Sequence, residues 1–118
     1  MARNYVNPGE HITFTAAADV ASGAGLAIGS MLAVALGAVA TGAEGTAAIE
    51  GVWELPKLGT AVITAGAPLI WDVSAGQFIV ASAATGDLLT CAVAVEAAGN
   101  GTTTVRAKLT PGAGSVSA

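Results

Sequence analysis

The sequence predicts an all-β fold in a single domain, and two observations lead to that prediction. Turn-forming residues recur at short, fairly even intervals along the 118-residue chain, which leaves room for strands and little for long helices. Between the turns, apolar and polar residues alternate with the period of two that a half-buried strand requires. We therefore expect short strands and tight turns over residues 11–110, an extended N-terminal arm at 1–10 and a flexible tail at 111–118.

The first expected strand covers residues 11–15. Ile12 and Phe14 share one face there, while two threonines share the other, and β-branched threonine suits the exposed side of a pleat. His11 lies on the threonine side. We expect it to be exposed.

Two later segments alternate in the same way. Residues 47–55 are expected to form one strand, with Ile49 and Trp53 on one side and Glu50 and Glu54 on the other. Residues 104–109 alternate most regularly and give the clearest strand prediction in the chain.

The stretch 20–43 contains no charged residue, so a membrane-spanning helix and a set of strands compete for it. Glycines interrupt the stretch, and its bulky residues come only in short bursts. Between Arg3 and Lys57 there is no cation to anchor a spanning helix at either end. We favour strands and turns, and within residues 30–40 we prefer a strand or loop to an alanine-rich helix.

The composition predicts an assembled protein. Charged residues make up 10% of the chain, against a usual share of about 25%, and hydrophobic residues make up 53% with a mean hydropathy of +0.70. One small core cannot absorb so much apolar surface, so part of the exterior is expected to be buried against other subunits. The net charge of −4, with only four cations, excludes a typical nucleic-acid footprint.

The residues predict no catalytic chemistry. A phosphate-binding glycine motif is absent, and His11 is the only histidine, so one chain cannot build a histidine metal cluster or a histidine relay. Cys91 alternates with Leu89 and Val93 and is expected to be a core residue. We expect no enzyme activity, cofactor, metal or small-molecule substrate. The enzymatic alternative that stays open is a small hydrolase using Asp72 and Glu54.

Three aromatic residues stand out. Trp53 and Trp71 each lie in a motif at the end of an expected strand, and a core role is the better explanation for each residue taken alone. Tyr5 lies in the polar arm, where a core role is hard to assign.

These motifs carry a resemblance to a known family. The arm at 2–9, the motif GVWELPK at 51–57, the motif AGAPLIWD at 65–72, and the closing segments 93–97 and 105–109 occur in that order. Together they resemble a family of small tailed-bacteriophage proteins that act as capsid decoration, or cement, proteins. The resemblance covers nearly the whole chain. It implies a small β-barrel or tulip-like domain that forms a homotrimer at local threefold positions on the outside of the phage head.

The resemblance also implies partners and roles. The partner is the major capsid protein, and the virion protein, made in the bacterial host cytoplasm, lies on the outer capsid surface with no nucleic-acid or membrane partner. The arm residues Arg3, Asn4 and Tyr5 are expected to contact the capsid. The expected trimer-interface residues are Trp53, Leu55, Pro56 and Trp71.

Two further alternatives remain. One is a minor phage head protein. The other is a membrane-inserted, holin-like protein, for which residues 20–43 would have to be helical.

Overall fold

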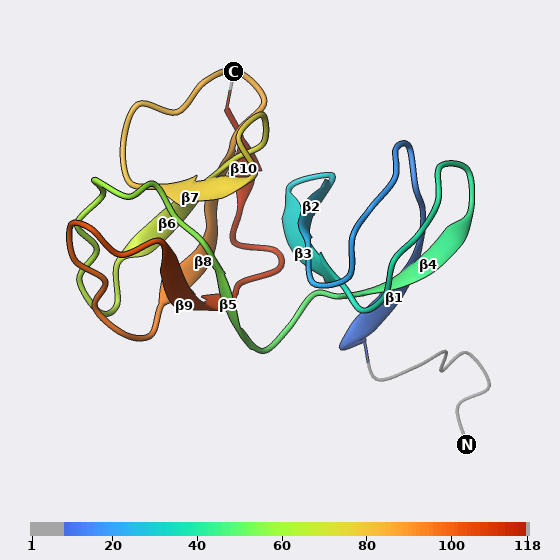
Figure 1. Cartoon of the computed structure of the whole chain (residues 1–118), viewed down its shortest axis with the longest axis horizontal. Helices are drawn as coiled ribbons and strands as arrows, with labels where there is room; N and C mark the ends of the chain where they lie inside the picture. The colour runs from blue at the N-terminus through green and yellow to red at the C-terminus, as the bar shows by residue number, and fades with distance from the viewer. Residues whose placement is uncertain (1–8, 118) are drawn as a thin grey trace.

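The described part of the chain folds into ten short β-strands, so the predicted all-β class is confirmed. The computed structural model describes residues 9–117 and has no helix within them (Figure 1). In chain order the strands are β1 (His11–Thr15), β2 (Gly25–Ile28), β3 (Met31–Ala35), β4 (Glu44–Ala48), β5 (Val52–Pro56), β6 (Pro68–Asp72), β7 (Gln77–Ile79), β8 (Leu88–Ala94), β9 (Thr104–Leu109) and β10 (Ser115–Val116).

Strands β1 to β4 form a four-stranded antiparallel sheet in the order β1-β4-β3-β2, which we call the small sheet. Strand β1 has the predicted bounds, with Phe14 buried and His11 exposed. Gly45 pairs with Phe14, and a Cβ at that glycine would collide with Val39. The missing side chain therefore lets Val39 close over the small-sheet core.

The uncharged stretch 20–43 forms β2, β3 and their flanking turns. Ile28 pairs with Met31, which closes a two-residue hairpin, and Gly29 supplies the positive φ of +60° that such a turn needs. The preference for a strand or loop over a helix within residues 30–40 is confirmed by β3. No helix in the described residues 9–117 is long and apolar enough to cross a membrane.

The prediction of one strand over residues 47–55 is wrong, because the chain changes sheets there. Gly51 has a φ of +103°, which a continuous strand does not adopt. The bend is held by Trp53, whose Nε1 donates to the carbonyl oxygen of Glu50 at 3.0 Å. Strands β4 and β5 consequently belong to different sheets.

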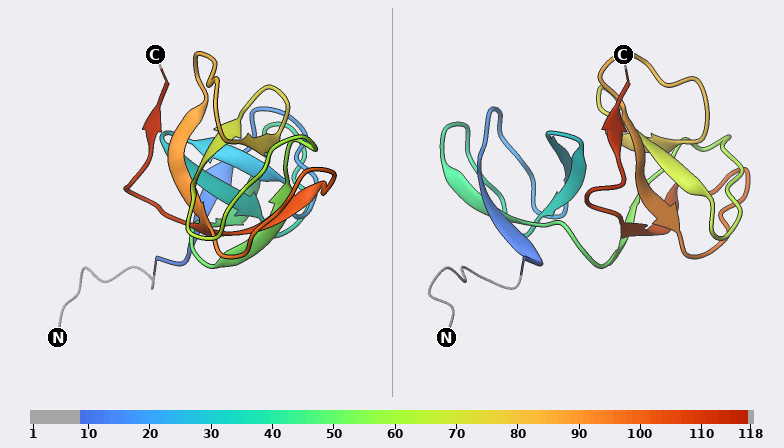
Figure 2. Two further views of the ribbon diagram at one scale, coloured as in Figure 1. Left: turned by 90° about the vertical axis from the view of Figure 1, so that its left-hand side faces the viewer. Right: turned by 180° about the vertical axis from the view of Figure 1, so that it is seen from behind.

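Strands β5 to β10 form a six-stranded antiparallel sheet, the large sheet, in the order β5-β9-β8-β6-β7, with β10 paired to β8. The sheet curls until its two ends meet at one isolated bridge between Lys57 and Phe78, where Leu58 N donates to Phe78 O at 2.9 Å (Figure 2). One bridge is not a continuous ladder. The closed barrel that the resemblance implied is therefore not formed.

Strand β8 bulges against β6. Leu69 pairs with Ala92 but Trp71 pairs with Leu88, so β8 contains two extra residues over the same span. Thr90 lies in the bulge with a φ of +53°, a conformation that non-glycine residues rarely adopt. Because of this bulge, Cys91 is buried, as predicted.

The segment after β9 packs across the bulge. Thr110 N donates to Cys91 O at 3.1 Å, and the Thr110 hydroxyl donates to Thr90 O at 3.0 Å. A Cβ at Gly114 would lie 2.6 Å from the carbonyl oxygen of Ser30, so only glycine fits this approach to the β2–β3 turn. Part of the segment predicted as a flexible tail thus pairs with β8 as β10.

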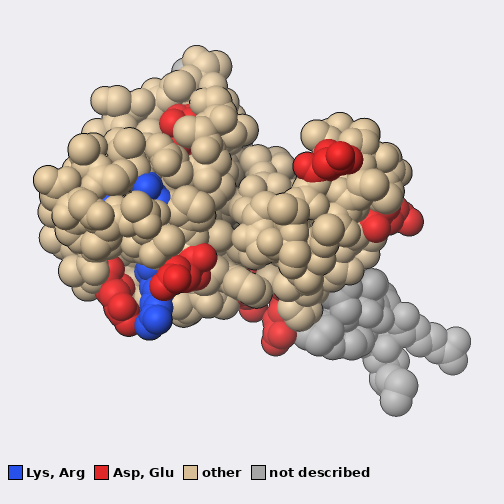
Figure 3. Space-filling model, in the orientation of Figure 1, with Lys and Arg blue, Asp and Glu red and all other residues tan. Residues whose placement is uncertain are grey.

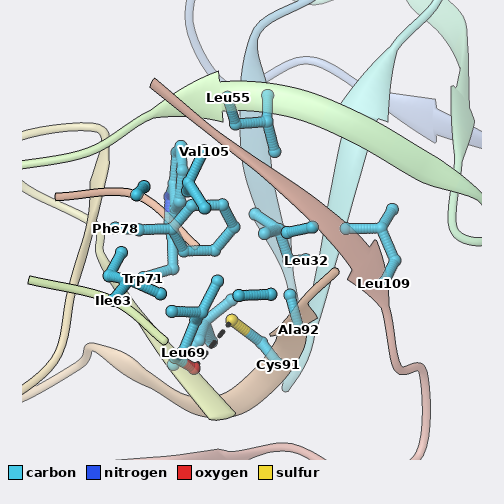
Figure 4. Packing of buried hydrophobic residues seen from close by; sticks show 14 of the residues in the cluster. Leu32, Leu55, Ile63, Leu69, Trp71, Phe78, Cys91, Ala92, Val105 and Leu109 are labelled. Atoms are coloured by element: carbon cyan, nitrogen blue, oxygen red, sulfur yellow. Dashed lines mark hydrogen bonds between the residues drawn. The ribbon is translucent and has the colours of Figure 1, made fainter. Parts of the chain in front are cut away.

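The small sheet has a core cluster of its own around Phe14, and a larger cluster joins the two sheets. The larger core cluster contains Leu32 and Val34 of β3 together with residues of the large sheet (Figure 4). Trp71 and Phe78 lie at its centre in an edge-to-face arrangement, with ring centroids 4.9 Å apart and planes at 80°. Burial of the β3 side chains among large-sheet residues fixes the two sheets against each other.

Candidate subunit and capsid interface

The outward face of β5 and β9 is the clearest candidate contact surface in the described part of the chain. Alternation turns Leu55 and Val105 inward and leaves the intervening side chains exposed. The register then brings Val52 beside Lys108 and Glu54 beside Arg106. We call this surface the outer patch, and its residues are Val52, Glu54, Pro56, Thr104, Arg106 and Lys108, with Val95 and Glu96 beyond the end of β8.

Arg106 lies between two carboxylates on the outer patch. Its Nε is 3.5 Å from Glu54 Oε1, and its Nη1 is 3.3 Å from Glu96 Oε1. All three side chains are more than half exposed, so these ion pairs add little to stability in water. Figure 3 shows a cationic group between acidic groups on the lower edge of the large-sheet half. The outer patch therefore combines positive and negative side chains with exposed valines, as protein–protein interfaces do.

The four predicted interface residues fall into two groups. Leu55 and Trp71 are each 2% exposed and belong to the core of the chain itself. Pro56 is exposed on the outer patch, and Trp53 is partly buried against the same core. The candidates that remain accessible for an interface are therefore Pro56, which is exposed, and Trp53, which is partly buried.

A second candidate surface is a groove of about 780 Å³ between the two sheets. It is lined by residues 13–20, by strand β2, and by Trp71, Val73 and Gly76. Most of these side chains are small or apolar, and Asp19 contributes a carboxylate. Asp19 accepts hydrogen bonds from Thr41 N at 2.8 Å and Thr41 Oγ1 at 2.9 Å, and the backbone bond is the main reason that the pKa of this carboxyl is lowered.

Two buried charged residues, Lys57 and Asp87, were not singled out by the sequence pattern. Lys57 Nζ donates to the carbonyl oxygens of Leu58 at 2.9 Å and Thr102 at 2.8 Å, and to those of Gly59 and Gly99 at longer range. The ammonium group therefore ties the loop after β5 to the loop before β9. The only feature of the sequence that could have indicated this role of Lys57 is its position directly after a strand and beside turn-forming segments.

Asp87 likewise ties two loops together through its buried side chain. Its carboxylate accepts from Val73 N at 3.2 Å and from Ala84 N at 2.9 Å. These backbone bonds satisfy a buried charge and join two loops.

The residues weighed for catalysis have the following environments in the described part of the chain. Glu54 and Asp72, the pair weighed for a hydrolase, lie on strands β5 and β6, which do not pair with each other, and Glu54 is exposed on the outer patch. Asp72 accepts from Ser74 Oγ at 2.9 Å and Ala75 N at 3.2 Å, as a turn residue does. Burial raises the pKa of the Cys91 thiol to about 11. Residues 9–117 contain no group of three metal-ligating side chains.

The predicted capsid-contacting residues Arg3, Asn4 and Tyr5 lie outside the described residues. Comparison with known families gives one finding about the whole chain. A family model described as phage cement protein matches residues 6–109. No curated protein matches the chain.

Proposed function

Because the chain belongs to the phage cement protein family, we propose that it binds the outer surface of a tailed-phage capsid as a homotrimer and stabilises the expanded head. The observation that carries this proposal is the family match, which extends from the arm to the end of β9. The family makes the chain a structural protein of a phage. The trimer, its position at local threefold sites and its stabilising effect are the proposed parts.

The outer patch supports the proposed trimer. A threefold interface is heterologous, so one surface of each copy meets a different surface of the next. The patch offers exposed Val52 and Val95 together with both signs of charge, and the sparse charge of the whole chain predicts that such a surface is buried in an assembly. We assign Trp53 and Pro56 to the rim of this interface.

We assign the contact with the major capsid protein to the arm. Arg3, Asn4 and Tyr5 precede β1, which is an edge strand of the small sheet. An extended segment with one aromatic and one cationic side chain suits binding along a neighbouring strand or in a shallow pocket.

The proposed stabilisation is mechanical. A protein that binds the expanded shell across subunit junctions adds binding free energy that disruption of the shell must overcome. Preferential binding to the expanded shell follows if expansion completes the binding site. Neither step requires a reaction.

Purified virions provide the test. Quantitative mass spectrometry should find this chain in amounts comparable to the major shell subunit. Heads lacking the chain should then break at a lower temperature than decorated heads, and added protein should restore the difference. Only a few copies per virion would instead indicate a minor head protein. Equal heat resistance with and without the chain would refute a stabilising role.

A further inference from the structure

We propose that the groove between the two sheets binds an extended, positively charged segment of the capsid subunit, which adds to the open edge of strand β2. This inference rests on the proposed function, and it names a second contact, on the folded part of the chain, with the same partner.

The groove has the size and lining of a peptide site. Its volume of about 780 Å³ lies within the range of roughly 300 to 1,000 Å³ that is usual for binding pockets. Strand β2 forms one wall, and residues 13–20 form another. A segment paired along all four residues of β2 would be about 13 Å long.

The backbone of β2 has an edge available for pairing. Strand β2 pairs with β3 on one side, and no strand among residues 9–117 pairs with its other side. Ala35 N donates to Ala24 O at 3.0 Å, and backbone groups in an antiparallel pair alternate in direction. The N–H and C=O groups of Gly25 and Ala27 therefore point away from β3. Such unpaired edges are sites of strand addition.

The side chain of Ala27 leaves room for a bound backbone at this edge. It is small and exposed and lines the groove, whereas the Trp71 ring fills the space beside Gly25. Val73, which is 46% exposed, also lines the groove. An incoming strand would bury this valine and complete the pairing of β2 in a single step.

Charge indicates the kind of segment that fits. Asp19 lines the groove, and its hydrogen bonds from Thr41 favour the ionised carboxylate. The small sheet and its loops, residues 9–51, carry the acidic side chains of Glu10, Asp19, Glu44 and Glu50 but no lysine or arginine. On the visible face of this half, the charged groups of the described residues in Figure 3 are all acidic. A segment carrying lysine or arginine is therefore the complementary partner.

The test uses expanded heads that lack this chain, with binding measured by co-sedimentation. Ala27→Pro removes the outward N–H and leaves the hydrogen bonds to β3, since proline is tolerated on an edge with its nitrogen facing outward. We expect this variant to bind heads about five- to tenfold more weakly, while the matched control Ala27→Ser binds like the wild type. Asp19→Lys should also weaken binding, whereas Glu44→Lys, outside the groove, should weaken it less.

Hydrogen exchange gives a second measurement on the wild-type chain. The amide of Ala27 should exchange more slowly on bound heads than in the free protein. Equal binding by wild type and Ala27→Pro, with unchanged exchange at Ala27, would overturn the groove site and leave the proposed function standing. Protection of Ala27 in the free protein that disappears on deletion of residues 1–8 would identify the chain's own arm as the occupant and overturn the proposal. Failure of the wild type to bind heads would overturn the proposed function itself.

Discussion

The indole ring of Trp71 lies directly against the backbone of Gly25, and this contact joins the large sheet to the small one. A Cβ at Gly25 would be 2.6 Å from Trp71 Cζ2 and 2.7 Å from Trp71 Cη2. The ring has no room to move, because it is buried and packs edge-on against Phe78. Glycine at this position is therefore a packing requirement rather than a turn requirement.

Gly25→Ala should destabilise the protein by about 1–3 kcal/mol, the usual cost of an added methyl group in a packed core. Urea unfolding would measure the change in the free energy of unfolding. Gly37→Ala is the control, since a Cβ there meets nothing within 4 Å and should change the free energy little. Trp71→Phe, which removes part of the obstructing ring, should reduce the additional cost of Gly25→Ala in a double-mutant cycle. Equal losses from the two alanine variants would contradict the contact.

Lys57→Met should be among the most destabilising single changes in the large sheet. Methionine keeps an apolar stem but removes the buried ammonium group that donates to four backbone carbonyl oxygens. We expect a loss of about 3 kcal/mol or more. Lys108→Met changes an exposed lysine on β9 and should alter stability by no more than about 0.5 kcal/mol. Similar effects of the two variants in urea unfolding would show that the Lys57 hydrogen bonds do not contribute.

The sequence predicted the strands that obey simple alternation and missed the features that depend on distant partners. Strands β1 and β9 have the expected bounds, because each presents one face to a core and the other to solvent. Residues 47–55 keep the expected inward and outward pattern, yet Gly51 breaks them into strands of different sheets. Periodicity shows which side chains are buried but does not show which sheet buries them.

The candidate contact surfaces were less predictable than the strands. Both tryptophans looked alike in sequence, but Trp71 is fully enclosed and Trp53 is only partly buried. The difference arises from position, since Trp71 lies in a central strand beneath the small sheet and Trp53 follows the bend between sheets. The groove joins residues 13–20 to Trp71 across more than fifty positions, and no local pattern could indicate it.

The Cys91 thiol should be unreactive in the folded protein at neutral pH. Its burial raises its pKa to about 11, so almost no thiolate forms, and the thiolate is the reactive species. A thiol reagent at pH 7.5 should modify the protein only after urea unfolding. Rapid modification of the folded protein would indicate that β8 opens locally.

The same pKa predicts how stability depends on pH. The folded state disfavours ionisation of Cys91, so its thiol has no effect on stability below the ordinary cysteine pKa of 9.0. Above that pH the unfolded chain loses the proton more readily, and stability should fall as the pH rises toward 11. Cys91→Ala, which carries no titrating group, should lack this component of the decline. An identical pH dependence in the two proteins would contradict the assignment.

Val52→Glu, on the outer patch, should prevent assembly of the proposed trimer without unfolding the single chain. The new carboxylate would face Lys108 across the strand pair, so it gains a favourable partner and the single chain should keep its stability. Burial of that carboxylate in a subunit contact would be costly, and the proposed trimer should therefore dissociate. Val62→Glu, at an exposed valine outside the strands, is the control and should leave assembly intact. Light scattering after size-exclusion chromatography gives the mass of each variant, and thermal unfolding of monomeric samples tests the fold. A Val52→Glu protein that stays trimeric would show that the outer patch is not part of the trimer interface.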